Sequence, residues 1–192
     1  MAYSPKILAF AGSARRESFN KKLLANSVKA AQLAGADVTV VDFLDYPMPL
    51  FNEDEEAQLG LPQTVLQFKG LLRRHHGLLL ACPEYNSSIT PLLKNALDWA
   101  SRPEPGDVSS CFQGKVAALL ATSPGALGGL RGLVHVRSVL STLGVMVIPN
   151  QKAIPRANQA FDANGDLVDS AQREAVSDVA QRLVEVTSKV MT

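Results

Sequence analysis

The stretch Lys6-Ile7-Leu8-Ala9-Phe10-Ala11-Gly12-Ser13-Ala14-Arg15-Arg16-Glu17-Ser18-Phe19-Asn20 decides the fold of this chain. Its residues 7–11 are all apolar, which predicts a short strand buried on both faces. Gly12 follows at once and indicates a sharp turn. Polar side chains fill the next positions, and helical spacing of apolar residues begins near Asn20. A buried strand that passes through a tight turn into a helix is a typical opening unit of an α/β fold.

The same alternation repeats along the 192 residues of the chain. Near-continuous apolar runs predict four more strands, at 38–41, 78–81, 116–121 and 145–148. Apolar residues at helical spacing predict helices at 20–34, 63–74, from Thr90-Pro91 onward, 127–143 and 170–190. Three long loops, 45–61, 102–114 and 149–169, interrupt this pattern. Loops of such length are usually functional or ordered by a partner.

We therefore predict an α/β fold with a five-stranded parallel sheet in the strand order 2-1-3-4-5 and helices on both faces. Residues 1–192 are expected to form a single domain, because no linker, repeat or low-complexity tract divides them. The chain is too short for an eight-unit barrel. In a sheet of this order, ligands bind at the carboxyl ends of the strands, beside the point where the strand order reverses.

Composition narrows the classes of function. The formal net charge is +1, which argues against a nucleic-acid partner bound by bulk charge. The two cysteines, Cys82 and Cys111, form no CxxC pair, and no residues have the spacing of a metal site, so no metal is predicted. No apolar run approaches the ~20 residues that span a bilayer, and no signal peptide is evident. We expect a cytoplasmic protein without a membrane partner.

The first turn has the composition of a phosphate site. If Gly12 ends the strand and Ser18 begins the helix, the helix offers unpaired N–H groups and the positive end of its dipole to an anion. Ser13, Arg15 and Asn20 add side-chain donors. Side chains in place of the glycines of a dinucleotide loop suit one terminal phosphate. The alternative is that Ser18 merely caps the helix and the arginines face solvent.

Two motifs resemble one known family. Residues 12–20 fit the signature GSxRxxSxN of the NAD(P)H-dependent FMN reductases, and PEYNxS at 83–88 with LKNAxDW at 93–99 fits their second signature. The resemblance covers nearly the whole chain and implies a three-layer, flavodoxin-like fold that binds FMN and uses NADPH or NADH as co-substrate. It also implies a homodimer or homotetramer in which the helix that contains Trp99 contributes to a dimer interface, and Trp99 itself is expected in the core or at that interface. The group includes quinone, chromate and azo-compound reductases.

The second motif follows the third strand, so it is expected beside the phosphate turn. The resemblance implies that this motif flanks the isoalloxazine ring, and Thr122-Ser123-Pro124-Gly125 should border the ring from the other side. Glu84 has two open roles, as a ligand or as a brace for its turn, and Tyr85 is either a ring contact or a surface aromatic. Close approach of the backbone and room for a nicotinamide are equal explanations for the glycines after Ser123. The predicted FMN-binding residues are Gly12, Ser13, Arg15, Ser18, Phe19, Asn20, Pro83, Glu84, Tyr85, Asn86, Ser87, Ser123 and Gly125.

The predicted function is transfer of hydride from NAD(P)H through FMN to a small oxidised acceptor in a ping-pong scheme. The acceptor would be a quinone, an azo compound, free flavin or a metal oxyanion. No catalytic side chain is predicted, because the cofactor carries the chemistry. The alternatives are a flavodoxin-type electron carrier and a flavin-binding regulatory module. The sequence decides neither the acceptor nor the choice between NADH and NADPH.

Overall fold

The computed structural model describes residues 4–191. One parallel sheet forms its centre, in the order β2-β1-β3-β6-β7. The strands of this sheet are β1 (Lys6–Ala11), β2 (Asp37–Val41), β3 (Gly77–Ala81), β6 (Val116–Thr122) and β7 (Met146–Ile154). Because β6 and β7 are its fourth and fifth strands along the chain, the predicted order 2-1-3-4-5 is confirmed. The order reverses between β1 and β3.

Seven helices and a small hairpin complete the described part of the chain. The helices are α1 (Phe19–Leu33), α2 (Glu53–Leu59), α3 (Gln63–Arg74), α4 (Pro91–Ser101), α5 (Leu130–Thr142), α6 (Ala157–Ala160) and α7 (Ser170–Met191). The hairpin pairs β4 (Glu84–Tyr85) with β5 (Ser88–Ile89) in antiparallel fashion. It stands directly after β3, where the second motif falls.

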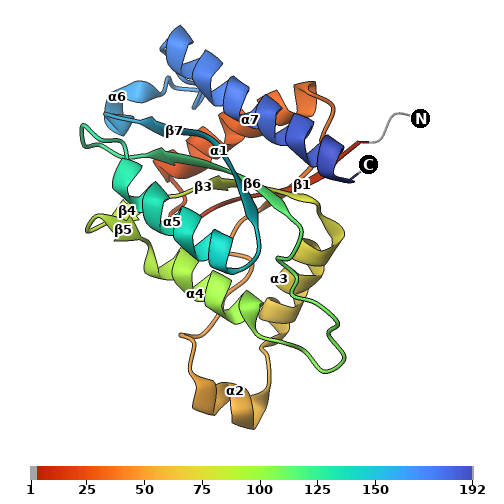
Figure 1. Ribbon diagram of the computed structural model, residues 1–192. Helices are drawn as coiled ribbons and strands as arrows, with labels where there is room; N and C mark the ends of the chain where they lie inside the picture. Colours follow the sequence, from red (N-terminus) through yellow and green to blue (C-terminus); the bar gives the residue numbers. More distant parts are fainter. Residues whose placement is uncertain (1–3, 192) are drawn as a thin grey trace.

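Helices cover both faces of the sheet, giving three layers (Figure 1). Helices α1 and α7 lie on one face, and α3, α4 and α5 lie on the other. Alternate residues of β1 supply the two cores: Ile7 and Ala9 pack with the α1 and α7 layer, whereas Leu8 and Phe10 pack with the opposite layer. The central strands have core on both sides, so they read as continuous apolar runs rather than alternating ones.

Two predicted boundaries are wrong, and backbone chemistry explains both. Helix α5 begins at Leu130 rather than 127, because Gly128 and Gly129 hold left-handed φ angles of 62° and 90° that a helix does not accept. The last strand runs to Ile154 rather than 148. Its pairing with β6 shifts register after Val147, and Pro149, which has no N–H to donate, falls in that bulge.

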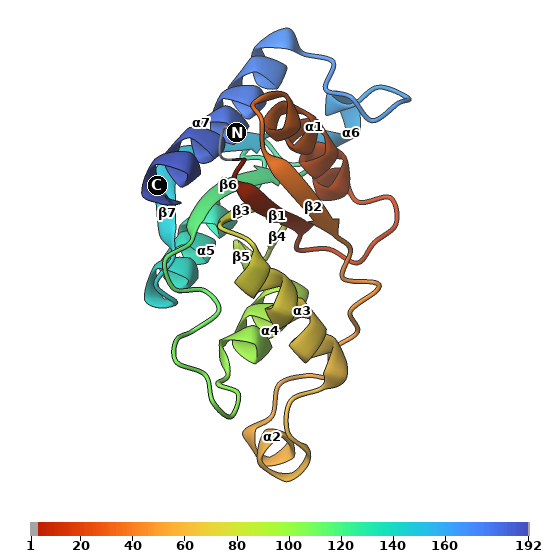
Figure 2. The ribbon, with the colours of Figure 1, turned by 90° about the vertical axis from the view of Figure 1, so that its right-hand side faces the viewer.

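Two of the predicted loops contain structure. Loop 45–61 includes α2, a helix with no buried residue that stands away from the body of the molecule below α3 and α4 (Figure 2). Loop 149–169 contains the end of β7 and the short helix α6. Helix α2 buries no residue and so has no amphipathic pattern, and the four residues of α6 are too few to show one.

Candidate functional site

Three connections meet at the carboxyl edge of the sheet. Ala11 at the end of β1 pairs with Ala81 at the end of β3, and Ala81 pairs with Leu120 of β6. The backbone N–H of Gly12 donates to the Ala81 carbonyl at 2.9 Å, which extends the pairing into the turn itself. The structure therefore brings together the segments that follow β1, β3 and β6, all three of which were predicted to form the site.

Gly12 is needed for packing rather than for conformational freedom. A Cβ at this position would lie 3.0 Å from Cβ and Cδ2 of Leu93 and 3.2 Å from Cδ of Pro83. The Thr90 hydroxyl donates to the Gly12 carbonyl at 2.8 Å and accepts the N–H of Leu93, so it caps α4 at the same time. Thr90 thus fixes the first turn against the start of α4.

The N-terminus of α1 points into the first turn without a side-chain cap. Ser18 occupies the N-cap position in extended conformation, but its side chain accepts no hydrogen bond from the helix. The first N–H groups of an α-helix have no partner within the helix. Ser13, only 7% exposed, accepts the N–H of Arg15 at 3.3 Å, which leaves its own hydroxyl proton to donate. These groups lie together at the end of β1, and unpaired N–H groups at a helix start attract anions.

The two arginines of the turn lie on its exposed side. Arg15 reaches the Glu17 carbonyl at 3.4 Å, which is at the long limit for a hydrogen bond. Arg15 and Arg16 are both exposed. The Arg15 guanidinium therefore forms no ion pair or short hydrogen bond in this turn.

Asn20, predicted to donate to a phosphate, is engaged elsewhere. Its Nδ2 donates to the Thr122 carbonyl at 2.9 Å, and its Oδ1 accepts the Thr122 N–H at 3.1 Å. The side chain is buried, and it ties the start of α1 to the end of β6. Phe19, also predicted to bind FMN, stacks its ring on that of Phe161, with centroids 6.2 Å apart.

The hairpin after β3 makes a tight turn at its tip. Asn86 and Ser87 both have positive φ, 51° and 64°, which is the conformation of a type I′ turn. Neither is glycine, so the turn stores some strain. Tyr85 is 51% exposed at the tip, where it can face a ligand.

Glu84 braces the hairpin against α5. Its Oε2 accepts the N–H of Gly132 in the first turn of α5 at 2.8 Å, and its Oε1 lies 3.7 Å from Nε of Arg131. The N-cap of this helix is Gly129, which has no side chain to do the capping. The Glu84 carboxylate therefore takes the place of a cap, and its negative charge interacts favourably with the positive end of the helix dipole. Of the two roles left open for Glu84, the structure shows the brace.

The third segment, the loop that follows β6, leaves open space around Gly125. The N–H of Arg156 donates to the Gly125 carbonyl at 3.2 Å, and the N–H of Ala157 donates to the Ser123 carbonyl at 3.0 Å. A Cβ on Gly125 would meet only the Ser123 hydroxyl, at 3.7 Å. The site-facing backbone of this loop is therefore accessible, and the chain after β7 supports it.

Sequence reasoning missed the supporting roles of Thr90, Thr122 and Gly132. Thr122 and Gly132 meet Asn20 and Glu84 through backbone atoms, and a backbone partner has no sequence signal. Thr90 was recognisable only as a helix cap. Across residues 4–191, no three His, Cys, Asp or Glu side chains gather into a group able to hold a metal ion.

The N-terminus of α1, the polar hairpin after β3 and the loop at Gly125 lie at one edge of a flavodoxin-like sheet. The profile of the NADPH-dependent FMN reductase family matches residues 5–159, so the chain belongs to this family. The predicted family and enzyme class, an oxidoreductase, are thereby confirmed, as is the cofactor pair of FMN with NAD(P)H that the family uses.

Individual relatives are similar to this chain in sequence or structure over almost their full lengths. The chain is 38% identical over 179 residues to an NAD(P)H-dependent FMN reductase of Pseudomonas aeruginosa, covering 93% of this chain and 92% of that one. It is 37% identical over 171 residues to a 2-hydroxy-1,4-benzoquinone reductase of Burkholderia, covering 88% of each. Among solved structures, the flavoenzyme NAD(P)H:(acceptor) oxidoreductase FerB of Paracoccus denitrificans superposes with a TM-score of 0.82 at 26% identity, over 96% of this chain and 98% of that one.

A structure with lower sequence identity supports the fold but not the function. An archaeal flavodoxin superposes with a TM-score of 0.61 at 12% identity, over 97% of this chain and 99% of that one. Within the described residues, none of the helices combines the length and the apolar character that crossing a bilayer requires.

Proposed function

We propose that this chain passes hydride from NAD(P)H through bound FMN to a small oxidised acceptor. The acceptor would be a quinone, an azo compound, free flavin or a metal oxyanion. The observation that carries the proposal is the uncapped N-terminus of α1 beside the buried Ser13 hydroxyl, at the end of the inner strand β1. This geometry supports a single phosphate at the point where the predicted strand order reverses.

The first turn would hold the phosphate of FMN. The helix N–H groups and the hydroxyls of Ser13 and Ser18 are placed as donors, and the exposed Arg15 adds a charge-assisted contact. Asn20 enters this proposal as a positioning residue, because both polar atoms of its amide already pair with Thr122. The uncapped helix and the donor chemistry of the turn fit the group.

The hairpin and the open loop would hold the ring. Pro83 and Glu84 shape the turn, and Tyr85, Asn86 and Ser87 at the tip present an aromatic face and polar groups. On the other side, Ser123 and Gly125 leave accessible backbone. When bound, FMN supplies the redox chemistry, since its ring accepts hydride from NAD(P)H and gives it to an oxidised acceptor. The chain itself binds, orients and leaves one side open.

We further propose a ping-pong scheme, in which NAD(P)H and the acceptor use the same open side in turn. Residues 1–192 act in this proposal as a single FMN-binding domain in the cytoplasm. Both cysteines are free and buried, which is consistent with that compartment. Assembly into a homodimer or homotetramer is part of the same proposal.

The absorption spectrum of the purified protein tests cofactor binding. We expect a flavin band, and denaturation of the protein should release FMN into solution. Steady-state oxidation of NADPH and of NADH with a quinone acceptor tests the activity, and parallel double-reciprocal plots are expected for ping-pong kinetics. Stoichiometric FMN without turnover by either nucleotide would overturn the enzyme proposal and favour a flavodoxin-type electron carrier.

A further inference from the structure

An open cavity of about 340 Å³ lies beside the loop that follows β6. Ala126 of that loop lines it, together with residues of the α6 segment and of the start of α7. Figure 1 shows α6 next to this loop, at the same edge of the sheet as the β4–β5 hairpin. The N–H of Ala157 donates to the Ser123 carbonyl at 3.0 Å, so the loop at 123–126 separates the cavity from the proposed ring site. Cavities that hold small ligands begin at about 300 Å³.

Arg156, in the wall of this cavity, has a strained backbone. Its φ of 52° and ψ of 48° lie in the left-handed region, which residues with a side chain rarely adopt. The N–H of Arg156 donates to the Gly125 carbonyl at 3.2 Å, and its carbonyl accepts the N–H of Gln159 at 2.8 Å. Glycine could make both backbone contacts without strain. The backbone therefore gives no reason for an arginine here, and strain of this kind is concentrated at functional sites.

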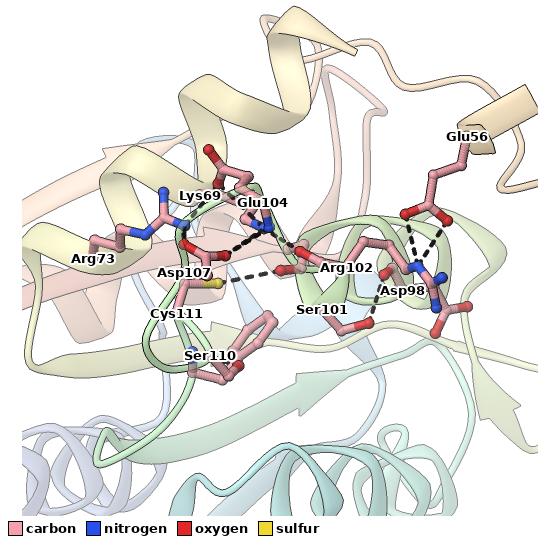
Figure 3. A network of polar contacts seen from close by, with 12 residues as sticks. Glu56, Lys69, Arg73, Asp98, Ser101, Arg102, Glu104, Asp107, Ser110 and Cys111 are labelled. Atoms are coloured by element: carbon pink, nitrogen blue, oxygen red, sulfur yellow. Dashed lines mark hydrogen bonds and ion pairs between the residues drawn. The ribbon is translucent and has the colours of Figure 1, made fainter. Parts of the chain in front are cut away.

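The guanidinium of Arg156 has no partner in the described part of the chain. It is exposed, and it forms neither a hydrogen bond nor an ion pair there. A second cavity, of about 220 Å³ under loop 102–114, differs in this respect. Its charges are paired internally, since Glu104 lies 2.7 Å from Arg73 and 3.2 Å from Lys69 (Figure 3). The charge of Arg156 is left for a ligand, and phosphate is an anion that arginine binds in bidentate fashion.

Gln172 adds a second unsatisfied group to the same cavity. Its carbonyl oxygen Oε1 is buried, and no donor among residues 4–191 reaches it. A buried acceptor without a donor is unfavourable, so a ligand N–H would relieve it. A glutamine amide offers an acceptor and a donor side by side, which matches the amine and the adjacent ring nitrogen of adenine. Pro155 and Val168, which is 54% exposed, add apolar surface for the faces of such a ring.

Asp169 is the acidic residue among those that line the cavity. Its Oδ1 accepts the N–H of Gln172 at 2.9 Å, in the first turn of α7. The carboxylate therefore lies beside Gln172, where its negative charge disfavours a phosphate. A ligand that carries both a base and a phosphate is thus oriented, with the base toward Gln172 and the phosphate toward Arg156.

We propose that this cavity receives the adenosine diphosphate portion of NAD(P)H, with adenine on Gln172 and the diphosphate on Arg156. The inference rests on the proposed function, because it names the place on this chain that anchors the hydride donor. The loop at 123–126 borders both this cavity and the proposed ring site, so a nucleotide anchored here lies next to the flavin. NADH and NADPH share the adenosine diphosphate portion, and Arg156 therefore contributes equally to the binding of both.

Arg156→Gly tests the assignment with the fold preserved, because glycine accepts the left-handed conformation. The variant should unfold at the temperature of the wild type or above it. The KM values for NADPH and for NADH should each rise about 10-fold or more, the loss expected for a hydrogen bond to a charged group, with kcat unchanged. FMN content should equal that of the wild type. The control Arg182→Ala, which removes an exposed arginine of α7, should leave both KM values unchanged.

Titration calorimetry with ADP-ribose reads the cavity without turnover, because this compound lacks the nicotinamide. Its affinity for the FMN-loaded protein should fall about 10-fold in Arg156→Gly and also fall in Gln172→Leu, which removes the amide. Unchanged affinity in both variants, or unchanged KM values in Arg156→Gly, would overturn the proposal. A larger rise in KM for NADPH than for NADH would assign Arg156 to the extra phosphate of NADPH and overturn its assignment to the diphosphate. Wild-type protein that holds FMN but turns over neither nucleotide would instead overturn the proposed function, and the ADP-ribose titration still decides what the cavity binds.

Discussion

The carboxamide of Asn20 forms two hydrogen bonds with the backbone of Thr122, one as donor at 2.9 Å and one as acceptor at 3.1 Å. The hydroxyl of Thr122 in turn donates to the Ile154 carbonyl at 2.8 Å. One side chain thus links the first turn to the ends of β6 and β7. The spacing between the proposed phosphate and ring sites depends on this link.

Asn20→Asp removes the donor and places a carboxylate against the Thr122 carbonyl. We expect the free energy of unfolding to fall by about 1–3 kcal/mol, the cost of leaving a buried polar group unsatisfied. Asn20→Ala should have a similar effect. Urea unfolding measures both, and Asn158→Asp, at an exposed position, is the control. Unchanged stability together with weaker FMN binding would return Asn20 to the role of a phosphate ligand.

Arg15→Ala tests the proposed phosphate contact. We expect FMN affinity to fall by roughly 1.5–3 kcal/mol, the range for a hydrogen bond between charged groups. Stability without FMN should barely change, because the arginine is exposed. Fluorescence titration of the apoprotein with FMN measures the affinity. As a control, Arg182→Ala, which breaks an exposed ion pair on α7, should leave the FMN affinity unchanged. If Arg15→Ala bound FMN as tightly as the wild type, Arg15 would not contact the phosphate.

Glu84→Ala and Glu84→Gln separate the effect of the hydrogen bond to Gly132 from the effect of the negative charge. Alanine leaves the Gly132 N–H without its partner, and we expect a loss of about 1–3 kcal/mol in unfolding free energy. Glutamine keeps an acceptor, so its loss should be smaller, limited to the dipole term of about 0.3–1 kcal/mol. Thermal and urea unfolding give the values. Equal effects of both substitutions would show that charge rather than the hydrogen bond holds the hairpin.

Two glycines in one loop should differ in how alanine affects stability. At Gly128 a Cβ would lie 2.6 Å from the Ile154 carbonyl carbon, and φ is 62°, so Gly128→Ala should destabilise by more than about 1 kcal/mol. Gly125→Ala has open space, and stability should hold. If the FMN ring approaches this backbone, Gly125→Ala will weaken FMN binding with the melting temperature of the apoprotein unchanged. A stable Gly128→Ala protein would contradict the close packing of this loop.

The ion pairs of Glu104 predict a dependence of stability on acid pH. Burial acts to raise the pKa of Glu104, but hydrogen bonds and charge from Arg73 and Lys69 outweigh it and hold the pKa below its usual value. The stabilisation is therefore complete above the unfolded pKa near 4.3 and is lost as pH falls through the lower folded value. Urea unfolding at about pH 5, 4 and 3 should show a shallower decline for Glu104→Gln than for wild type. An equally steep decline would assign the acid sensitivity to other groups.

Much of the fold was predictable because it rests on local pattern. Apolar runs located all five strands of the main sheet, and their alternation with helices allows few strand orders. Boundaries failed where a single residue overrides the pattern: Gly128 and Gly129 delay α5, and Pro149 sits in a bulge that lets β7 continue. Helix α2 escaped prediction because it buries nothing, so no amphipathic pattern marks it.

The sequence alone determined that the turn at 12–20 leads from a buried strand into a helix with hydroxyls and arginines at its start. Strand, turn and helix signals act over a few residues, so they can be read locally. Only the tertiary structure decided what each polar group of that turn does. Asn20 lies 102 positions from Thr122 along the chain, and Glu84 meets Gly132 across 48 positions. Such partners are backbone atoms, which every residue carries, and only the packing of the sheet selects them.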